Sequence, residues 1–109
     1  MSSAKAALES DVRTLAFEAG RRYGHRVNAI RAGVIASWAS SSLRGSVEDR
    51  IRFYERNAPL AERTRAADVA GAVVFLSSPL AGGITGSVVP VDMGVHAMGM
   101  SISGEPGST

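Results

Sequence analysis

The chain has 109 residues, 45% of them hydrophobic and 20% charged, which is ordinary globular composition and enough for one small domain. It has no cysteine, which excludes disulfides and thiolate metal sites, and its two histidines, His25 and His96, are too far apart in sequence to suggest a metal centre. The basic residues behind the net charge of +2 are spread along the chain, so we expect no nucleic-acid partner. No apolar stretch has membrane-spanning length, so we expect no membrane partner, and no secretory pattern opens the sequence.

The first predicted element is a helix over residues 2–22. Apolar side chains recur at three- and four-residue steps and therefore share one helix face; they are Leu8, Val12, Leu15, Ala16 and Ala19. Glu9 and Arg13 are four residues apart, in the order that favours an exposed ion pair. Gly24 suits the turn by which the chain leaves this helix.

The middle of the chain predicts a strand, a loop and a helix. Residues 27–30 form a short apolar run of the length of a buried strand. Residues 37–46 are rich in serine and are interpreted as a loop or a loosely formed helix. Ser46 is expected to cap the next helix, and Asn57-Ala-Pro59 is expected to end it. Three apolar residues share one face of that helix: Val47, Ile51 and Tyr54.

The last third predicts one more helix and one more strand. The helix covers residues 64–77 and carries Asp68 in its first turn. The strand covers residues 87–91. Pro90 has no amide hydrogen to donate to a neighbouring strand, so we expect part of this strand to lie at the edge of the sheet. Residues 101–109 are expected to form a disordered tail.

This order of elements is typical of an α/β layer fold. Two strands do not make a stable sheet by themselves, because the backbone groups at their outer edges need partners. The pattern therefore predicts an incomplete α/β sheet.

Lys5 is the first residue with chemical interest. It is the only lysine among twelve basic residues, and it lies near the positive end of the first helix, a poor place for a purely stabilising cation. A hydride-transfer enzyme can use such an ammonium group to hold ribose hydroxyls and to lower the pKa of a nearby tyrosine. The alternative is an exposed lysine without a partner, and position alone favours that alternative.

Three motifs carry a resemblance to a known family. Residues 1–11, Met-Ser-Ser-Ala-Lys-Ala-Ala-Leu-Glu-Ser-Asp, closely resemble the plant-type enoyl-acyl-carrier-protein reductases of fatty acid synthesis, in the short-chain dehydrogenase/reductase superfamily. Residues 26–33, Arg-Val-Asn-Ala-Ile-Arg-Ala-Gly, resemble the superfamily's R-V-N-x-I-x-x-G strand. Residues 91–99, Val-Asp-Met-Gly-Val-His-Ala-Met-Gly, are similar to the family's ending V-D-N-G-L-N-A-M-G. The resemblance implies that residues 1–100 form the C-terminal half of a short-chain dehydrogenase/reductase fold, a partial Rossmann-like doubly wound parallel sheet.

The resemblance also implies a site. Lys5 would be the catalytic lysine and would hold the ribose of NADH or NADPH. The other cofactor-binding residues would be Ala32, Gly33, Val34, Ile35 and Ser37. Contacts to the acyl chain of an enoyl substrate, carried by acyl carrier protein, would come from Ala39, Ser40 and Leu43. The chain departs from the family at Val34, where proline is usual, and this loss is expected to soften the turn.

Two parts of a complete reductase have no counterpart in these residues. The sequence contains no glycine-rich dinucleotide loop, and the family's catalytic tyrosine would lie just before Met1. Tyr23 and Tyr54 match no catalytic position. We therefore expect an incomplete reductase that is inactive alone, from a family of homo-oligomers, tetramers among them, and located in the cytoplasm of a bacterium or the plastid of a plant or alga. The alternatives are a non-catalytic oligomerisation or interaction module derived from a reductase, and a superfamily reductase acting on ketoacyl or small carbonyl substrates.

Overall fold

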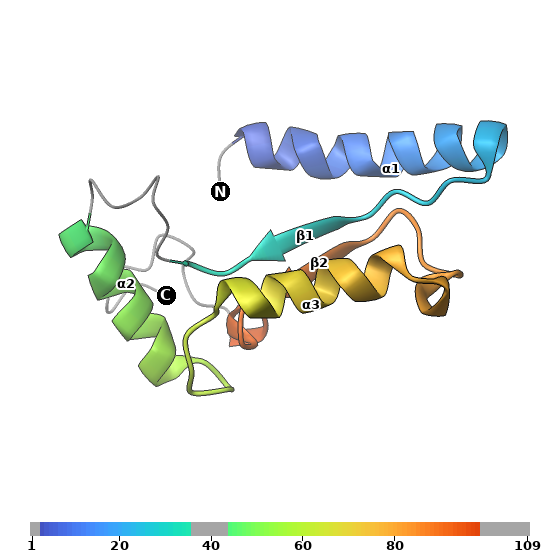
Figure 1. The fold of residues 1–109 in the computed structure, drawn as a ribbon. Helices are drawn as coiled ribbons and strands as arrows, with labels where there is room; N and C mark the ends of the chain where they lie inside the picture. Colours follow the sequence, from blue (N-terminus) through green and yellow to red (C-terminus); the bar gives the residue numbers. More distant parts are fainter. Residues whose placement is uncertain (1–2, 36–43, 99–109) are drawn as a thin grey trace. The chain divides into compact units, whose positions relative to one another are not determined.

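A computed structural model describes residues 3–35 and 44–98 (Figure 1). Helices and strands alternate along the described residues: α1 (Ser3–Tyr23), β1 (Ala29–Ala32), α2 (Arg44–Asn57), α3 (Ala66–Ser77), the 3-10 helix η2 (Pro79–Ala81), β2 (Val88–Val91) and the 3-10 helix η3 (Val95–Met98). The chain divides into two compact units. Unit 1 comprises Met1–Arg31 and Ala70–Val89, and unit 2 comprises Ala32–Val69 and Pro90–Thr109.

The two strands pair in parallel. In unit 1 the amide of Ala29 donates to the carbonyl of Ser87 at 2.9 Å, and in unit 2 the amide of Gly33 donates to the carbonyl of Val91 at 2.9 Å. From the first of these bonds to the second, each strand advances in the same direction and by the same number of residues, which is the parallel pattern. The carboxyl ends of β1 and β2 therefore lie at the same edge of the sheet. The predicted α/β order with a parallel sheet is thereby confirmed.

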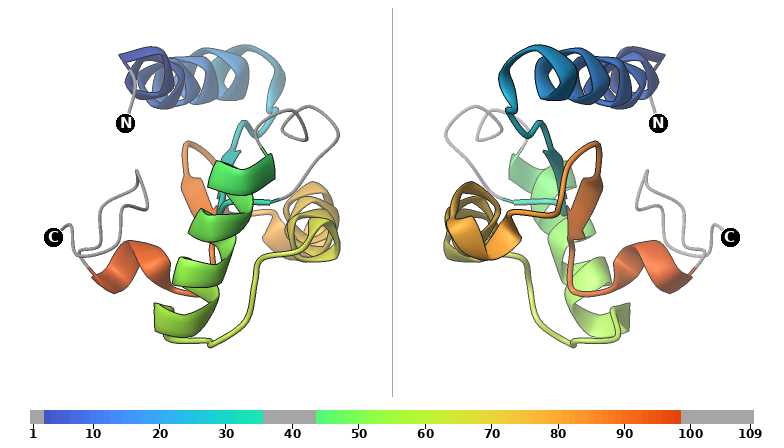
Figure 2. Two further views of the ribbon diagram at one scale, coloured as in Figure 1. Left: turned by 90° about the vertical axis from the view of Figure 1, so that its left-hand side faces the viewer. Right: turned by 90° about the vertical axis from the view of Figure 1, so that its right-hand side faces the viewer.

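In unit 1, α1 lies on one side of β1 and the carboxyl-terminal part of α3 on the other (Figures 1 and 2). Val12 and Ala16 are buried, as predicted, whereas Leu8 and Leu15 are 57% and 54% exposed. The predicted apolar face is therefore only partly right. A sheet of two short strands covers a narrow line along the helix, and the flanking leucines lie outside it.

Glu9 does not form the ion pair that local spacing suggested. Its carboxylate accepts from Arg31 on β1, with Nη2 at 2.8 Å and Nε at 3.2 Å from the same oxygen. The expected pairing with Arg13 is wrong. Both candidates are arginines, but Arg31 is held on a packed strand and loses less side-chain freedom on binding the carboxylate than the exposed Arg13 would. The exit turn after α1 is confirmed, since Gly24 has a φ of 68°.

In unit 2, α2 buries the three residues that its periodicity predicted: Val47, Ile51 and Tyr54. The helix begins at Arg44, so the prediction that Ser46 caps it is wrong, and no acidic residue lies in its first turn. Ser46 is the third residue of this helix and is therefore already past the cap position.

Arg63 ties α2 to the following segment of unit 2. Its Nη2 and Nε lie 3.1 Å from the two carboxylate oxygens of Glu55, and its Nη1 lies 3.5 Å from Glu48. The hydrogen bonds from Arg63, and then its charge, hold the pKa of Glu55 below the usual 4.5. Asp68 occupies the first turn of α3, as predicted, and its carboxylate accepts from the amide of Arg65 at 2.8 Å.

Candidate functional site

The candidate site begins where β1 ends. Ala32 closes the strand, and Gly33, Val34 and Ile35 follow it as a partly buried loop in unit 2. In open parallel α/β sheets, ligands bind beyond the carboxyl ends of the strands. The bond from the amide of Gly33 to the carbonyl of Val91 holds the start of this loop against the end of β2.

Gly33 permits an unusually close approach of three segments of unit 2. A Cβ atom at this position would lie 2.7 Å from the hydroxyl oxygen of Thr64 and 3.2 Å from the Cα of Asp92. Thr64 is itself buried. The glycine of the R-V-N-x-I-x-x-G motif is therefore required for close packing, and any side chain here would push the loop away from its support.

Asp92 organises the backbone that lies against Gly33. Its carboxylate accepts from the amides of Gly94 at 3.0 Å and His96 at 3.1 Å, and it lies 2.9 Å from Nδ1 of His96. The side chain thus caps the short helix η3 rather than offering a free oxygen to a ligand. The V-D-x-G motif was the signal for this role, although the sequence analysis used it only for the family resemblance.

The two residues that follow Asp92, Met93 and Gly94, both have left-handed backbone angles. Gly94 has a φ of 91°, and a Cβ there would lie 2.8 Å from Cγ of Pro59. Met93 has a φ of 59°, and its carbonyl accepts from the amide of Leu60 at 3.0 Å. The family motif has asparagine at the position of Met93, a residue that tolerates this conformation better.

The first half of the strand motif has a structural role in unit 1. Arg26 donates from Nη1 to the carbonyl of Leu76 at 2.7 Å and from Nη2 to that of Ser78 at 3.3 Å. Asn28 donates to the carbonyl of Ile84 at 2.9 Å. Arg26 thus satisfies carbonyl groups at the carboxyl end of α3, where a helix leaves its last carbonyl groups without partners. Asn28 satisfies a carbonyl group in the turn before β2. Sequence reasoning missed both contacts.

The remaining predicted site residues fall in different parts of the chain. Lys5 lies in the first turn of α1, in unit 1, and the loop of residues 32–35 lies in unit 2. The other predicted cofactor and substrate contacts lie outside the described residues: Ser37, Ala39, Ser40 and Leu43. The structure therefore brings together the loop residues 32–35, and their partners Thr64 and Asp92 were not predicted.

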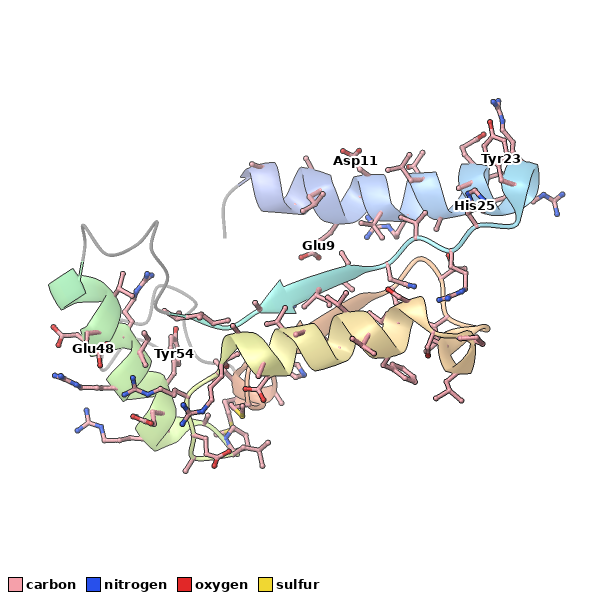
Figure 3. All side chains as sticks on the ribbon, viewed as in Figure 1. Glu9, Asp11, Tyr23, His25, Glu48 and Tyr54 are labelled. Carbon is pink, nitrogen blue, oxygen red and sulfur yellow. The ribbon has the colours of Figure 1, made fainter. Side chains whose placement is uncertain are left out.

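Neither tyrosine of the chain lies beside Lys5 within unit 1, the unit that contains this lysine. Tyr23 ends α1, is 68% exposed and has its ring 5.5 Å from that of His25 (Figure 3). At a rise of 1.5 Å per residue, it lies about 27 Å along the helix from Lys5. Tyr54 is buried on α2 in unit 2. The sequence analysis assigned neither tyrosine to catalysis.

Other kinds of site are not found in the part of the chain that the structure describes. No cluster of three metal-ligating side chains occurs among residues 3–35 and 44–98. None of the described helices combines the length and the apolar character that crossing a membrane requires.

Comparison with known proteins gives a consistent picture. A family described as "Enoyl-(Acyl carrier protein) reductase" matches residues 1–96. The chloroplastic enoyl-[acyl-carrier-protein] reductase [NADH] 2 of Oryza sativa subsp. japonica is 48% identical over 109 residues, which are all of this chain and 29% of that protein. The chloroplastic enzyme of Arabidopsis thaliana is 47% identical over 102 residues, covering 94% of this chain and 26% of that protein.

Solved structures agree with these sequence relationships. The Plasmodium berghei enoyl-acyl-carrier-protein reductase with triclosan has a TM-score of 0.84 and 39% identity, covering 89% of this chain and 34% of that one. The Bacillus cereus enzyme with NADP+ and an indole naphthyridinone has a TM-score of 0.83 and 41% identity, covering 89% of this chain and 37% of that one. The chain thus spans about a third of the solved structures that it matches and somewhat less of the plant proteins.

Proposed function

This chain belongs to the enoyl-(acyl carrier protein) reductase family, and from that premise we propose that it supplies the C-terminal part of an NADH-dependent enoyl reductase of fatty acid synthesis. The reaction would be hydride transfer to the β-carbon of a trans-2-enoyl thioester carried by acyl carrier protein. The predicted family and the predicted partial Rossmann-like fold are both confirmed by the family match and by the solved structures.

The loop after β1 is the observation that carries this proposal. A nicotinamide carboxamide has one acceptor and two donors, so it is recognised best by backbone groups held in one place. Residues 32–35 meet this need, because Gly33 is hydrogen-bonded to Val91 and packed against Thr64 and Asp92. We assign Ala32, Gly33, Val34 and Ile35 to the nicotinamide side of the cofactor site.

Lys5 is assigned to the ribose of the cofactor and to the activation of a tyrosine. NADH, when bound, supplies the hydride. A lysine ammonium near a tyrosine hydroxyl lowers the pKa of that hydroxyl, which can then donate a proton to the oxygen of the substrate as negative charge develops there. Ser37 is assigned to the cofactor phosphates, and the acyl chain is assigned to Ala39, Ser40 and Leu43.

The isolated 109-residue polypeptide is expected to be inactive. Its sequence contains no glycine-rich loop to hold a dinucleotide pyrophosphate, and neither of its tyrosines suits the catalytic position. The two plant relatives are chloroplastic, which supports a plastid location for a plant or algal source. The cytoplasm is expected for a bacterial one.

A chimeric enzyme tests the proposal directly. These 109 residues replace the matched 109 residues of the rice protein, and the chimera is assayed for NADH oxidation with a trans-2-enoyl thioester of acyl carrier protein. We expect activity within about tenfold of the rice enzyme. Lys5→Ala in the chimera should lower kcat/KM by about 10²–10³, the usual effect of losing a group that stabilises the transition state.

Arg13→Ala is the matched control, because Arg13 is an exposed cation on the same helix, two turns further along. It should leave kcat/KM unchanged. A well-folded chimera without enoyl reductase activity, or equal losses in the Lys5 and Arg13 variants, would contradict the proposed function.

A further inference from the structure

We propose that Arg31 is a positioning residue for the reductase reaction: it holds the carboxylate of Glu9, so that this carboxylate does not pair with the ammonium group of Lys5. The inference rests on the proposed function, since it takes Lys5 as the residue that binds the cofactor ribose and activates a tyrosine. It is carried by the place of Glu9 on α1 and by the bond between Glu9 and Arg31, all within unit 1.

Lys5 and Glu9 occupy neighbouring positions on one face of α1. Residues four apart in a helix share a face, with Cβ atoms about 5–6 Å apart. Positions 5, 9, 12 and 16 follow one another at helical steps, and Val12 and Ala16 of this row are buried. The position of Lys5 therefore belongs to the row that packs toward β1, one helical turn before Glu9.

The carboxylate of Glu9 is turned toward β1 and is already bound there. Figure 3 shows Glu9 on the side of α1 that faces β1, whereas Asp11 points away from it. The Nη2 and Nε atoms of Arg31 lie 2.8 and 3.2 Å from one oxygen of Glu9. The side chains of Glu9 and Arg31 are 24% and 36% exposed, so this pair is screened less than one on the open surface. The charge of Glu9 is thereby neutralised on the sheet side of α1.

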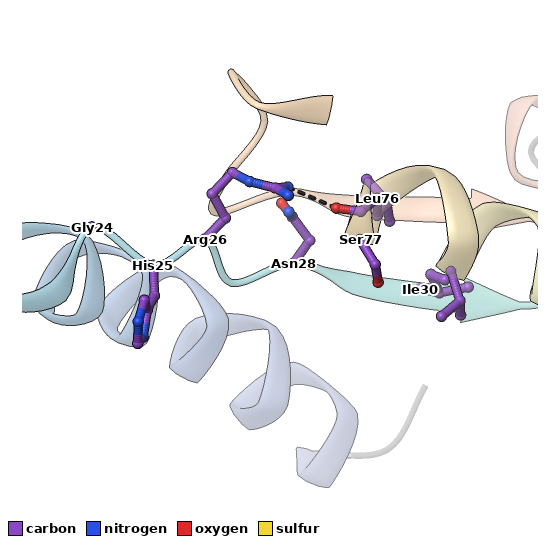
Figure 4. A pocket seen from close by; sticks show the side chains of 8 residues that line it. Gly24, His25, Arg26, Asn28, Ile30, Leu76 and Ser77 are labelled. Carbon is purple, nitrogen blue, oxygen red and sulfur yellow. Dashed lines mark hydrogen bonds between the residues drawn. The ribbon is translucent and has the colours of Figure 1, made fainter. Parts of the chain in front are cut away.

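Two other arginines of unit 1 are near in sequence, and neither is suited to this task. Arg13 lies four residues after Glu9, but it is exposed and outside the buried row, where an ion pair contributes little. Arg26 precedes β1, and its guanidinium donates to the carbonyl of Leu76 at the end of α3 (Figure 4). Of these three arginines, only Arg31 neutralises Glu9.

A free carboxylate beside Lys5 would oppose both tasks assigned to that lysine. An ammonium group has three donors and no acceptor, so a carboxylate that takes one of them competes with the ribose hydroxyls. The negative charge would also weaken the positive field that lowers the pKa of the catalytic tyrosine. Arg31 prevents both effects by acting through Glu9, which makes it a positioning residue and not a catalytic one.

The rice chimera tests this role with Arg31→Met, which keeps an unbranched side chain and removes the guanidinium. Glu9 then has its charge without this partner, and kcat/KM for NADH oxidation should fall about tenfold, between the effects of one opposite charge in water and in a protein interior. Adding Glu9→Gln removes the free carboxylate, and kcat/KM should return to within about threefold of the parent chimera. The Tm should stay below that of the parent chimera in both variants, because both lack the ion pair between α1 and β1.

A purely structural tie would give a different pattern of losses. If Arg31 only holds α1 against β1, the double variant will be as slow as Arg31→Met, and that result would overturn the inference. Arg31→Met combined with Lys5→Ala should lose no more activity than Lys5→Ala by itself, and additive losses would contradict an action through Lys5. Arg22→Met is the matched control: it breaks the pair with Glu18, 3.6 Å away near the other end of α1, and should leave kcat/KM unchanged. A loss equal to that of Arg31→Met would count against the inference.

The outcomes separate this inference from the proposed function. Full activity in Lys5→Ala would refute the role of Lys5, and the inference would fall with it. A large loss in Lys5→Ala with full activity in Arg31→Met would overturn the inference alone. Arg31→Gln replaces Arg31→Met if the latter does not fold, because glutamine still donates to Glu9 but carries no charge. It should lower kcat/KM in the same direction, and an unchanged value would equally overturn the inference.

Discussion

Gly33→Ala should disturb cofactor binding, because it places a methyl group in a tightly packed part of the loop after β1. The new Cβ would lie 2.7 Å from the hydroxyl oxygen of Thr64 and 3.2 Å from the Cα of Asp92. Thr64 is buried, so its side chain has little room to turn away. Overpacking of this kind costs about 1–3 kcal/mol. A domain of the size of the full reductase loses about 2–4 °C of Tm for each kcal/mol.

The rice chimera provides the assay. We expect Gly33→Ala to lower its Tm and to raise KM for NADH, because the overlap moves the backbone assigned to the nicotinamide. Thr64→Ala removes the closest atom, so the double variant should recover part of both losses, while the overlap with Asp92 remains. Gly83→Ala is the control, since a Cβ there meets nothing within 4 Å. An unchanged KM in Gly33→Ala, or no recovery in the double variant, would refute this reasoning.

Three further predictions use the Tm of the same chimera. Gly94→Ala should be strongly destabilising, because a left-handed alanine costs about 1–2 kcal/mol and its Cβ would also lie 2.8 Å from Pro59. Met93→Asn should stabilise by about 0.5–1 kcal/mol, because asparagine tolerates a φ of 59° better than methionine. Glu55→Gln should make Tm depend less on pH on the acid side. Arg63 lowers the pKa of Glu55 in the folded state, so the ionised Glu55 stabilises the fold above about pH 4.5. This stabilisation is lost as the pH falls through the lowered pKa, and the variant has none to lose.

Each of these predictions has a matched comparison. Gly24→Ala adds a methyl at a φ of 68° with nothing within 4 Å, so it should cost less than Gly94→Ala. Equal losses at the two glycines would show that contact with Pro59 contributes nothing. A lower Tm in Met93→Asn would argue against strain at that residue. Glu62→Gln alters another carboxylate of unit 2 and should leave the acid profile unchanged, whereas an unchanged profile in Glu55→Gln would contradict the role of Arg63.

Periodicity and local chemistry predicted the elements of this protein well. Apart from the start of α2, which precedes the predicted cap Ser46, the α-helices and strands lie within two residues of the predicted bounds. The buried face of α2 is the one that spacing indicated. Such features depend on residues only a few positions apart, so their spacing can be seen directly in the sequence. The errors arose where a local preference lost to a distant partner, as when Glu9 bonded to Arg31.

The short motifs of the sequence were sufficient by themselves for the family and the α/β class, and they pointed to the loop after β1 as a candidate site. Only the tertiary structure decided why Gly33 must be glycine and how Asp92 supports it. Those features depend on residues such as Gly33, Thr64 and Asp92, which lie tens of positions apart and meet only when strands and helices pack. Close packing is a property of the folded chain, and no local pattern of residues records which distant atoms it will bring into contact.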